Sequence, residues 1–463
     1  MSVEPGATAY QEIAPALTDL SPTLRLSFPA RERLAVAVVL LGALGVAFMW
    51  LHDTAPLRSF AEWLVAVGRL SGLEGTYALL VTVVLLARVS WIDDFLGMDR
   101  LFRWHGRLGA VAIWLLVVHA FTIIWGYSAS FHTPIVSETR AVVLDLPDML
   151  IATVGLALLV AVGVLSMRSL RRRLRYETWH FVHLYVYVAI ALSFAHQFST
   201  GFDFASHPLN RAVWIAMYAV TFGLLLWYRL VTPVRRSRRH DLRVASVTRE
   251  TGRASSLHIE GRGLLELRAA PGQFFIWRFL SRERWWQAHP FSISQAPTDE
   301  SLRVTVGASG DFTNDLASLA PGTRVIAEGP FGSFTWSARR GTRALFVAAG
   351  SGIGPIRGIL EMVPDGVGPT LVYRASEPAD AALRAEVDEL VERLGGSVHY
   401  LFGPRGERHE LGRPQWYRTI LSGDPSQYDV FLCGPHALMR EVTAALVTAG
   451  FGRSRIHYEH FVT

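Results

Sequence analysis

The chain has 463 residues, enough for two or three domains, and its mean hydropathy of +0.27 with 18% charged residues is too apolar for an ordinary soluble protein. Lys and Arg exceed Asp and Glu by six, but the Arg clusters lie beside apolar runs, so membrane topology explains them better than nucleic-acid binding, which we exclude. The single cysteine, Cys433, excludes disulfides within the chain, CxxC zinc sites and cysteine-ligated iron–sulfur clusters.

The first part of the chain is predicted to be a membrane domain. Residues 1–30 are polar, contain four prolines and show no cleavable signal, so we interpret them as a cytoplasmic N-terminal tail. Apolar runs of spanning length follow near 34–52, 72–90, 108–127, 149–167, 179–198 and 211–231. We therefore predict a six-helix transmembrane bundle over residues 31–234.

The arginines decide the expected orientation of the bundle. They flank the first, third and sixth runs and fill the connection between the fourth and fifth: Arg31, Arg33, Arg100, Arg103, Arg107, Arg168, Arg171, Arg172, Arg173, Arg175, Arg235, Arg236, Arg238 and Arg239. All of these places fall on one side of the membrane if both termini are cytoplasmic. We expect a multi-pass cell-membrane protein whose loops 53–71, 128–148 and 199–210 face outward.

After Arg239 the pattern changes to that of folded cytoplasmic domains. Short strands broken by Gly and Pro turns over 241–335 predict a small antiparallel β-barrel, in a domain at 235–340. From 343 onward strands alternate with helices, which predicts an α/β domain with a parallel sheet at 341–463. The predicted fold class is a multidomain membrane protein: a transmembrane bundle, then a β-barrel, then an α/β domain.

Four histidines lie inside predicted spans, where imidazole is costly unless it has a partner. His105 and His119 are fourteen residues apart on the third span, and His183 and His196 are thirteen apart on the fifth. Fourteen helical residues rise about 21 Å and return to within about 40° of the same face. Because both spans run in the same direction, His105 can face His183 and His119 can face His196, which suggests two stacked bis-imidazole heme sites.

The interval on the fifth span fits an ideal helix poorly. Thirteen residues leave His183 and His196 roughly 140° apart, so either a π-bulge or kink lies between them or His180 is the partner instead. The alternative for all four is a set of core histidines that hydrogen-bond neighbouring helices. Zinc is a weaker alternative, because neither carboxylate nor thiol accompanies the histidines at the same depth.

Two patterns in the second half suggest nucleotide and flavin binding. The turn from Gly350 to Pro355 follows an apolar strand and opens a helix, where glycines let the backbone approach a pyrophosphate. Arg374 and Ser376, after the next strand, suit a ribose 2′-phosphate and favour NADPH, although Arg374 could instead pair with Glu377. The run His289–Ser294 has the alternation of hydroxyls and an aromatic that suits the edge and face of a flat ring.

Together these residues resemble the ferric reductase and NADPH oxidase superfamily, a six-span heme domain followed by a ferredoxin–NADP reductase-like module. The resemblance covers about residues 30–463, with the motifs in the family's order. It implies that the four histidines, including the thirteen-residue pair, are the ligands of two b-type hemes. It also implies that His289-Pro290-Phe291-Ser292 is the flavin-binding HPF[ST] motif, with Ser292 approaching the isoalloxazine of FAD.

Further motifs carry the resemblance into the soluble half. Gly310-Asp-Phe-Thr313 is similar to the segment after the flavin motif, and Gly329-Pro-Phe-Gly332 to the turn ahead of the nucleotide domain. The implied cofactor-binding residues are Ser294, Thr313, Gly350, Gly352, Gly354, Pro355, Arg374, Ser376 and Gly434, besides the HPFS motif.

The resemblance also implies two catalytic residues near the C-terminus. Cys433-Gly434-Pro435 is similar to the family's CGP motif, with the thiol of Cys433 near the nicotinamide; the alternative is a buried packing cysteine. Phe461 resembles the aromatic that stacks over the flavin, although two residues follow it. No EF-hand pattern occurs, so calcium gating is not expected.

The implied activity is transmembrane electron transfer, from cytoplasmic NADPH through FAD and two hemes to an acceptor outside. The favoured acceptor is oxygen, which would become superoxide. The alternatives are a ferric-chelate reductase, an electron-supplying subunit for an extracytoplasmic redox protein, and a flavoreductase merely tethered to the membrane. The sequence leaves the acceptor, the oligomeric state and the regulation open.

Overall fold

The computed structural model describes residues 28–52, 54–174, 176–205, 207–251, 254–282, 285–307, 313, 315–404 and 409–460. The tail predicted for 1–30 therefore lies almost wholly outside the described residues. The chain divides into two compact units, and the boundary between them lies between Arg229 and Leu230. One unit is helical, and the other holds all the strands.

The helical unit contains the apolar spans. Its helices are α2 (Phe28–His52), α3 (Phe60–Leu85), α4 (Ser90–Leu96), α5 (Met98–Phe131), α6 (Ile135–Asp145), α7 (Met149–Leu165), α8 (Arg168–Arg171), α9 (Tyr176–His183), α10 (Tyr185–Leu192), α11 (His196–Ser199), α12 (Phe202–Ala205) and α13 (Pro208–Leu226). The last one continues through a π-helical turn, η1 (Trp227–Val231), into α14 (Thr232–His240).

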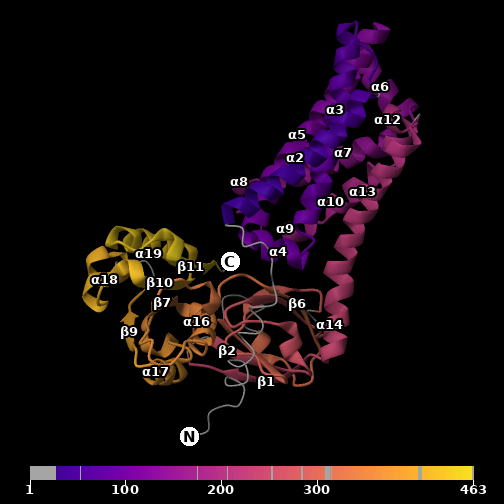
Figure 1. Ribbon diagram of the computed structural model, residues 1–463. Helices are drawn as coiled ribbons and strands as arrows, with labels where there is room; N and C mark the ends of the chain where they lie inside the picture. Colours follow the sequence, from indigo (N-terminus) through magenta and orange to yellow (C-terminus); the bar gives the residue numbers. More distant parts are fainter. Residues whose placement is uncertain are drawn as a thin grey trace. The chain divides into compact units, whose positions relative to one another are not determined.

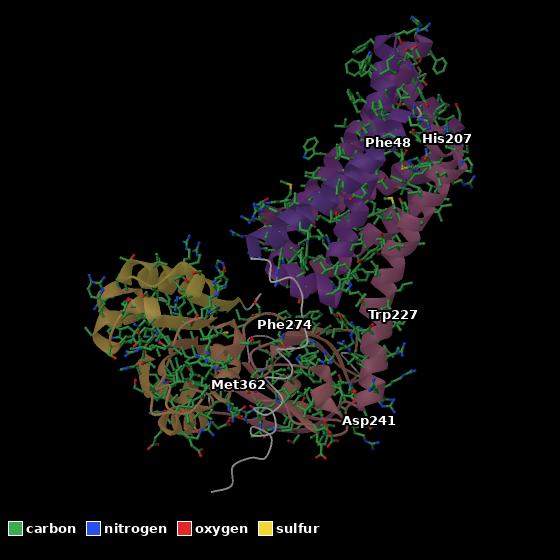
Figure 2. The ribbon with its side chains drawn as sticks, viewed as in Figure 1. Phe48, His207, Trp227, Asp241, Phe274 and Met362 are labelled. Atoms are coloured by element: carbon green, nitrogen blue, oxygen red, sulfur yellow. The ribbon has the colours of Figure 1, made fainter. Side chains whose placement is uncertain are left out.

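Within the described residues, five helices are long and apolar enough to cross a membrane, or six if the pair α6–α7 counts as one span. That pair is bent by 108°, so part of the outer loop predicted at 128–148 is helical. The second span begins at Phe60 rather than near 72, because Ser59 and Glu62 cap it reciprocally. Apolar side chains on the spans face outward, as Phe48 does with 69% of its surface exposed (Figure 2).

Glycines on α3 bring it close to α5, and Figure 1 shows the two helices side by side. A Cβ added at Gly68 would lie 2.8 Å from Thr122, one at Gly72 2.6 Å from His119, and one at Gly75 3.0 Å from Leu116. The three positions repeat at helical spacing, so they form one stripe on α3. Close approach of this kind is how membrane helices gain packing contacts without a hydrophobic driving force.

In the unit that holds the strands, the part with the predicted flavin motif, which we call the flavin-side half, is antiparallel. Its strands are β1 (Arg243–Arg249), β2 (Ala254–Glu260), β3 (Phe274–Phe279), β4 (His289–Ser292), β5 (Ser301–Gly307) and β6 (Val325–Phe331). They form two three-stranded sheets, in the orders β1-β2-β5 and β4-β3-β6. Isolated bridges link Arg243 to Arg324 and Ile293 to Val304 around a shared core. Closure into one barrel stays a prediction.

Helix α14 is hydrogen-bonded to the sheet β4-β3-β6. Arg236 donates to the carbonyl of Gly329, and the Ser237 hydroxyl donates to the carbonyl of Val325, both on β6. The helix that leaves the last span is thus part of the soluble unit's own packing.

The remaining strands form one parallel sheet in the order β11-β10-β7-β8-β9. They are β7 (Arg343–Ala349), β8 (Thr370–Ala375), β9 (Ser397–Phe402), β10 (Tyr428–Gly434) and β11 (Ile456–His460). Alternate residues of β7 face opposite cores, because Phe346 packs with α16 (Ile353–Leu360) and α17 (Arg384–Arg393), while Val347 packs with α18 (Pro414–Ile420) and α19 (His436–Ala449). Helices therefore cover both faces of the sheet, as a parallel sheet requires (Figure 1).

We predict that Phe431→Ala destabilises this sheet strongly. Phe431 is fully buried on β10, and its ring lies 5.2 Å from that of Phe346 and 5.0 Å from that of His457. Truncating such a residue costs about 3–5 kcal/mol. Limited proteolysis of the purified chain across a urea series measures the loss. Val447→Ala, at an exposed position of α19, is the control, and equal midpoints for the two variants would contradict the assignment of the core.

Candidate functional site

The structure brings the four membrane histidines together in two pairs. The ring centroids of His105 and His183 lie 5.9 Å apart, and those of His119 and His196 lie 6.5 Å apart. A metal–imidazole bond is about 2 Å long, so a metal held between two facing rings separates their centroids by roughly 6 Å. The spacing within each pair suits one metal, and these are the pairs that the sequence predicts.

Hydrogen bonds at Nδ1 orient three of the four rings. Nδ1 of His105 lies 3.2 Å from the carbonyl of Thr82, and Nδ1 of His119 lies 2.8 Å from the carbonyl of Gly68. Nδ1 of His183 lies 3.2 Å from the hydroxyl of Ser166. A ring held at Nδ1 presents Nε2 to a metal, which is the usual arrangement around metal-binding histidines.

The fifth span reaches both partners because it is not one regular helix. It consists of α9, α10 and α11, separated at Leu184 and at Ser193–Ala195. Several amides there bond three residues back, as Phe194 does to Ala191 and Phe198 to Ala195. Each residue in such a tightened turn advances about 120° instead of about 100°, which adds rotation in the sense that the thirteen-residue interval lacks. The break is a set of tightened turns, and the π-helical turn of this chain lies at η1 instead.

The paired residues fit a heme iron better than a metal with more protein ligands. Nδ1 of His196 is buried and has no hydrogen-bond partner among the described residues, so this ring retains capacity for another group. Within the described part of the chain, no group of three or more His, Cys, Asp or Glu side chains could hold a metal ion. Two neutral imidazoles per site are the donor set of a bis-histidine heme.

The predicted flavin motif occupies β4, at the edge of its sheet. His289 and Phe291 lie on one face with parallel rings 6.2 Å apart, and Ser292 is buried. The indole of Trp277 donates to the carbonyl of Phe291 (2.9 Å), which fixes the strand from β3. Pro290 is exposed, so this edge of the sheet has an open side.

The other residues predicted for the flavin lie in different surroundings. The hydroxyl of Ser294 is fully buried and accepts from Thr305 (2.8 Å), which also bonds Ser256 (2.9 Å). Thr313 is half-buried, while Gly310–Phe312 lie outside the described residues. A flavin contact for Ser294 and Thr313 stays a prediction.

The glycine-rich turn has the shape of a nucleotide loop. Gly350 is exposed with φ +56°, a conformation that favours glycine. Gly352 packs against the backbone of Cys433. A Cβ added at Gly354 would lie 3.4 Å from the carbonyl oxygen of Thr305. Pro355 lies in the first turn of α16, where its missing N–H leaves no bond unmade. The N-terminus of α16 therefore opens beside the end of β10, at the carboxyl edge of the sheet, where ligands bind in such folds.

Arg374 is placed differently from its predicted role. Its side chain is buried, and it donates to the carbonyls of Ala375, Leu401, Gly403 and Pro404. These bonds brace the chain after β9, whereas Ser376 at the end of β8 is exposed. Arg374 thus bonds backbone carbonyls rather than Glu377, and its contact with a 2′-phosphate stays a prediction.

Cys433 is fully buried at the end of β10, as the packing alternative expects. Burial, and secondarily the charge of Glu459, raise the pKa of its thiol well above the usual range. Sequence reasoning missed Glu459 on β11, whose charge acts on this thiol and whose carboxylate lies near Gly332 in the turn after β6. Phe461, predicted to stack on the flavin, lies outside the described residues.

Family profiles match three successive parts of the chain. A ferric reductase-like transmembrane component matches residues 71–194, an FAD-binding domain matches 250–335, and an oxidoreductase NAD-binding domain matches 346–444. The first match contains three of the four histidines and ends just before His196. The three matched domains follow one another in the order found in ferric reductases and NADPH oxidases. The chain belongs to this superfamily. Its domains are those of an NAD(P)H-dependent oxidoreductase.

Curated relatives match over less than half of this chain. The stachydrine N-demethylase reductase subunit Stc4 of Rhizobium meliloti (strain 1021) is 32% identical over 37% of this chain and 52% of its own. The ferredoxin reductase component of 3-ketosteroid-9-alpha-monooxygenase from Mycolicibacterium smegmatis is 32% identical over 48% and 65%. Ferredoxin–NADP reductase B of Sorangium cellulosum is 30% identical over 37% and 77%. The chain spans between half and two thirds of the first two relatives.

Solved structures are similar at lower identity. The FAD/NAD-binding domain of nitric oxide dioxygenase from Vibrio cholerae O1 biovar El Tor has a TM-score of 0.41 and 19% identity, over 48% of this chain and 97% of that one. The ferredoxin reductase in carbazole 1,9a-dioxygenase has a TM-score of 0.40 and 19% identity, over 48% and 66%.

We expect Arg374→Ala to lower kcat/KM for NADPH and for NADH by similar factors, because the carbonyls that it braces would lose their donors. Steady-state kinetics with both coenzymes measure this, and Arg440→Ala, an exposed arginine on α19, is the control. A decrease of kcat/KM for NADPH alone, with the value for NADH unchanged, would contradict the bracing role and support the 2′-phosphate contact.

We also expect Cys433 to resist alkylation in the folded chain. Its raised pKa keeps the thiol protonated through the pH range where a free cysteine ionises, near pH 8.5, and burial excludes the reagent. Iodoacetamide at pH 8 should label it roughly 100-fold more slowly than in urea. Because this is the only cysteine, intact mass gives the rate directly. Equal rates in the folded and unfolded chain would show that the site is open.

Proposed function

We propose that this chain carries electrons across a membrane, from cytoplasmic NADPH through FAD and two hemes to an extracytoplasmic acceptor, with oxygen as the favoured acceptor. The observation that carries the proposal is the pairing of His105 with His183 and of His119 with His196 inside the apolar helices. Six spans, with both termini and the soluble domains in the cytoplasm, complete the proposed arrangement, supported by the arginine clusters at one set of helix ends.

The proposed reaction balances with oxygen as acceptor: NADPH and two O₂ give NADP⁺, one proton and two superoxide ions. When bound, FAD takes two electrons from NADPH as hydride and releases them singly, and each heme accepts one at a time.

The residues of the chain have separate tasks in this scheme. His105 and His183 would hold one iron, and His119 and His196 the other, with two imidazoles on each. If two imidazoles hold each iron, an acceptor would receive its electron without binding the iron itself. The carbonyls of Thr82 and Gly68 keep two of these rings in a fixed tautomer and orientation.

The soluble residues would bind and orient the two organic groups. The edge of β4, with Ser292 buried and Phe291 beside it, is proposed to take the flavin, together with Ser294 and Thr313. The loop of Gly350, Gly352, Gly354 and Pro355 is proposed to take the pyrophosphate at the start of α16. Cys433 and Gly434 end the neighbouring strand, where the neutral thiol would pack against the nicotinamide without acting as a nucleophile.

One alternative has an observation in its favour. The curated relatives are named as reductase subunits or components of monooxygenases and a demethylase, so this chain could supply electrons to a separate extracytoplasmic protein. A ferric-chelate reductase is the other alternative, in keeping with the description of the matched transmembrane component.

The proposal is tested with purified chain, NADPH and FAD, with and without ferric chelate. We expect a visible spectrum typical of low-spin heme and superoxide formation, measured by superoxide dismutase-sensitive cytochrome c reduction, at a rate that matches NADPH consumption. Absence of heme absorption would leave only a tethered flavoreductase. Iron reduction without superoxide would select the ferric-chelate alternative.

The ligand assignment has its own variant. His119→Ala should lower the heme content by about half and abolish superoxide formation, because one axial ligand is lost, while NADPH still reduces the flavin. His52→Ala, at an exposed position on α2, is the matched control. Retention of the full heme content by His119→Ala would exclude this residue as a ligand.

A further inference from the structure

Helix α16, which opens with the nucleotide loop, is seated directly on the flavin-side strands. A Cβ added at Gly358 would lie 3.1 Å from the carbonyl of Ile293 and 3.2 Å from Pro271. One added at Gly354 would lie 3.4 Å from the carbonyl of Thr305. The two glycines are four residues apart and so lie on one face of the helix. Glycine at these positions lets the helix approach the strands closely, and at Gly358 a side chain would be tight against the strand backbone.

Four charged side chains surround this contact. Arg303, on β5, donates to both carboxylate oxygens of Glu386 on α17, at 3.1 and 2.9 Å. Nε of Arg357, on α16, lies 2.7 Å from the same carboxylate. Arg357 also pairs with Glu361, four residues further along. We call these four residues the interdomain clamp.

The clamp holds the backbone that follows the flavin motif. Arg303 and Arg357 both donate to the carbonyl of Ser294, at 3.2 and 3.4 Å, and Glu361 accepts from the amide of Ala296. Ser294 lies two residues after Ser292 on the chain. Three side chains from both domains thus fix the segment that leaves β4. Figure 2 labels Phe274 on β3 and Met362 just beyond α16, which locate the two sides of the contact.

The clamp is buried and its charges balance. The side chains of Arg303, Arg357 and Glu361 are 7–9% exposed, and that of Glu386 is 35% exposed. Burial opposes ionisation of Glu386, but the hydrogen bond from Arg303 and the charge of Arg357 outweigh it and keep the pKa of that carboxyl below its usual range. Because a buried network weakens sharply when one charge is removed, its members act as a unit.

We propose that the interdomain clamp Arg303–Glu386–Arg357–Glu361 positions the nucleotide helix against the flavin strand and thereby sets the approach of the nicotinamide to the flavin. Its members are positioning residues, since their contacts are with one another and with the backbone of Ser294 and Ala296 beside the two motifs. The inference rests on the proposed function, in which hydride passes from NADPH to FAD while the flavin takes one proton from solvent.

The sensitivity of hydride transfer to distance makes this testable. A misplacement of about 1 Å at a site remote from the chemistry can slow a reaction by about 100-fold. Glu386→Gln keeps the shape of the side chain but removes the charge that both arginines share. We expect it to slow flavin reduction at saturating NADPH by about 10- to 100-fold, with the Kd for NADPH changed less than threefold. Arg303→Gln should act in the same way, and the double variant should be no slower than the slower single one.

The measurement uses the full-length chain in detergent. Anaerobic stopped-flow absorbance follows flavin bleaching, and 4-deuterated NADPH reports whether hydride transfer limits the rate. Hydrogen exchange of FAD-free, NADPH-free protein supplies a second readout: peptides covering 353–362 and 293–297 should exchange faster in Glu386→Gln. Arg413→Gln, which removes an exposed ion pair to Glu410 in the same domain, is the matched control and should change neither readout.

Two results would overturn the proposal. One is flavin reduction at the wild-type rate in Glu386→Gln and Arg303→Gln. The other is a loss that tracks FAD content alone, with the flavin-loaded fraction still reduced at the wild-type rate, because that pattern marks a merely structural role. Failure of the proposed function would differ from both, since the wild-type chain itself would then fail to pass electrons from NADPH through flavin to heme.

Discussion

The membrane half of this protein depends on one constraint: an imidazole buried among apolar helices is costly unless it has a partner. The helix backbone supplies the first partner. Thr82 lies in the last turn of α3, whose carbonyls have no regular helical donor, and one of them meets His105. A ring held at Nδ1 keeps its orientation, so the backbone of α3 helps to hold His105 opposite His183.

The glycine stripe on α3 makes that arrangement possible. Gly72 lies directly behind His119, at a separation that a methyl group could not tolerate, and Gly68 both approaches α5 and provides its carbonyl to the ring. The same residues therefore serve packing and orientation. On the partner side, tightened turns around Leu184 and Ser193 rotate the fifth span so that both of its histidines face α5. Regular helix geometry on both spans could not have produced the two pairs.

Sequence patterns predicted what is local and periodic. The alternation of strands and helices predicted after residue 343 is present, because this signal depends on near neighbours. The start of the second span was missed because Gly and Glu residues near 60–75 lower the hydropathy there, whereas a capping box extends the helix. Arg374 shows the other limit: the residue type predicted a phosphate ligand, but carbonyls some thirty positions away occupy its donors. The clamp joins residues up to 83 positions apart and has no local signature.

Side chains are held in place by neutral hydrogen bonds in the helical unit and by ion pairs at the contact of α16. The lower dielectric constant among the apolar helices explains this difference. In the bundle, the histidines are oriented by neutral carbonyls and a hydroxyl, because a lone charge in hydrocarbon is costly. Arg69, a charged residue on α3, pairs with the carboxylate of Asp203. At the contact between the flavin-side strands and α16, buried charges can be tolerated because each has an opposite partner, and Arg303, Arg357 and Glu361 also bond the backbone. Charge-assisted hydrogen bonds are more directional than apolar contacts, so they suit an interface in which the two sides must keep one relative position.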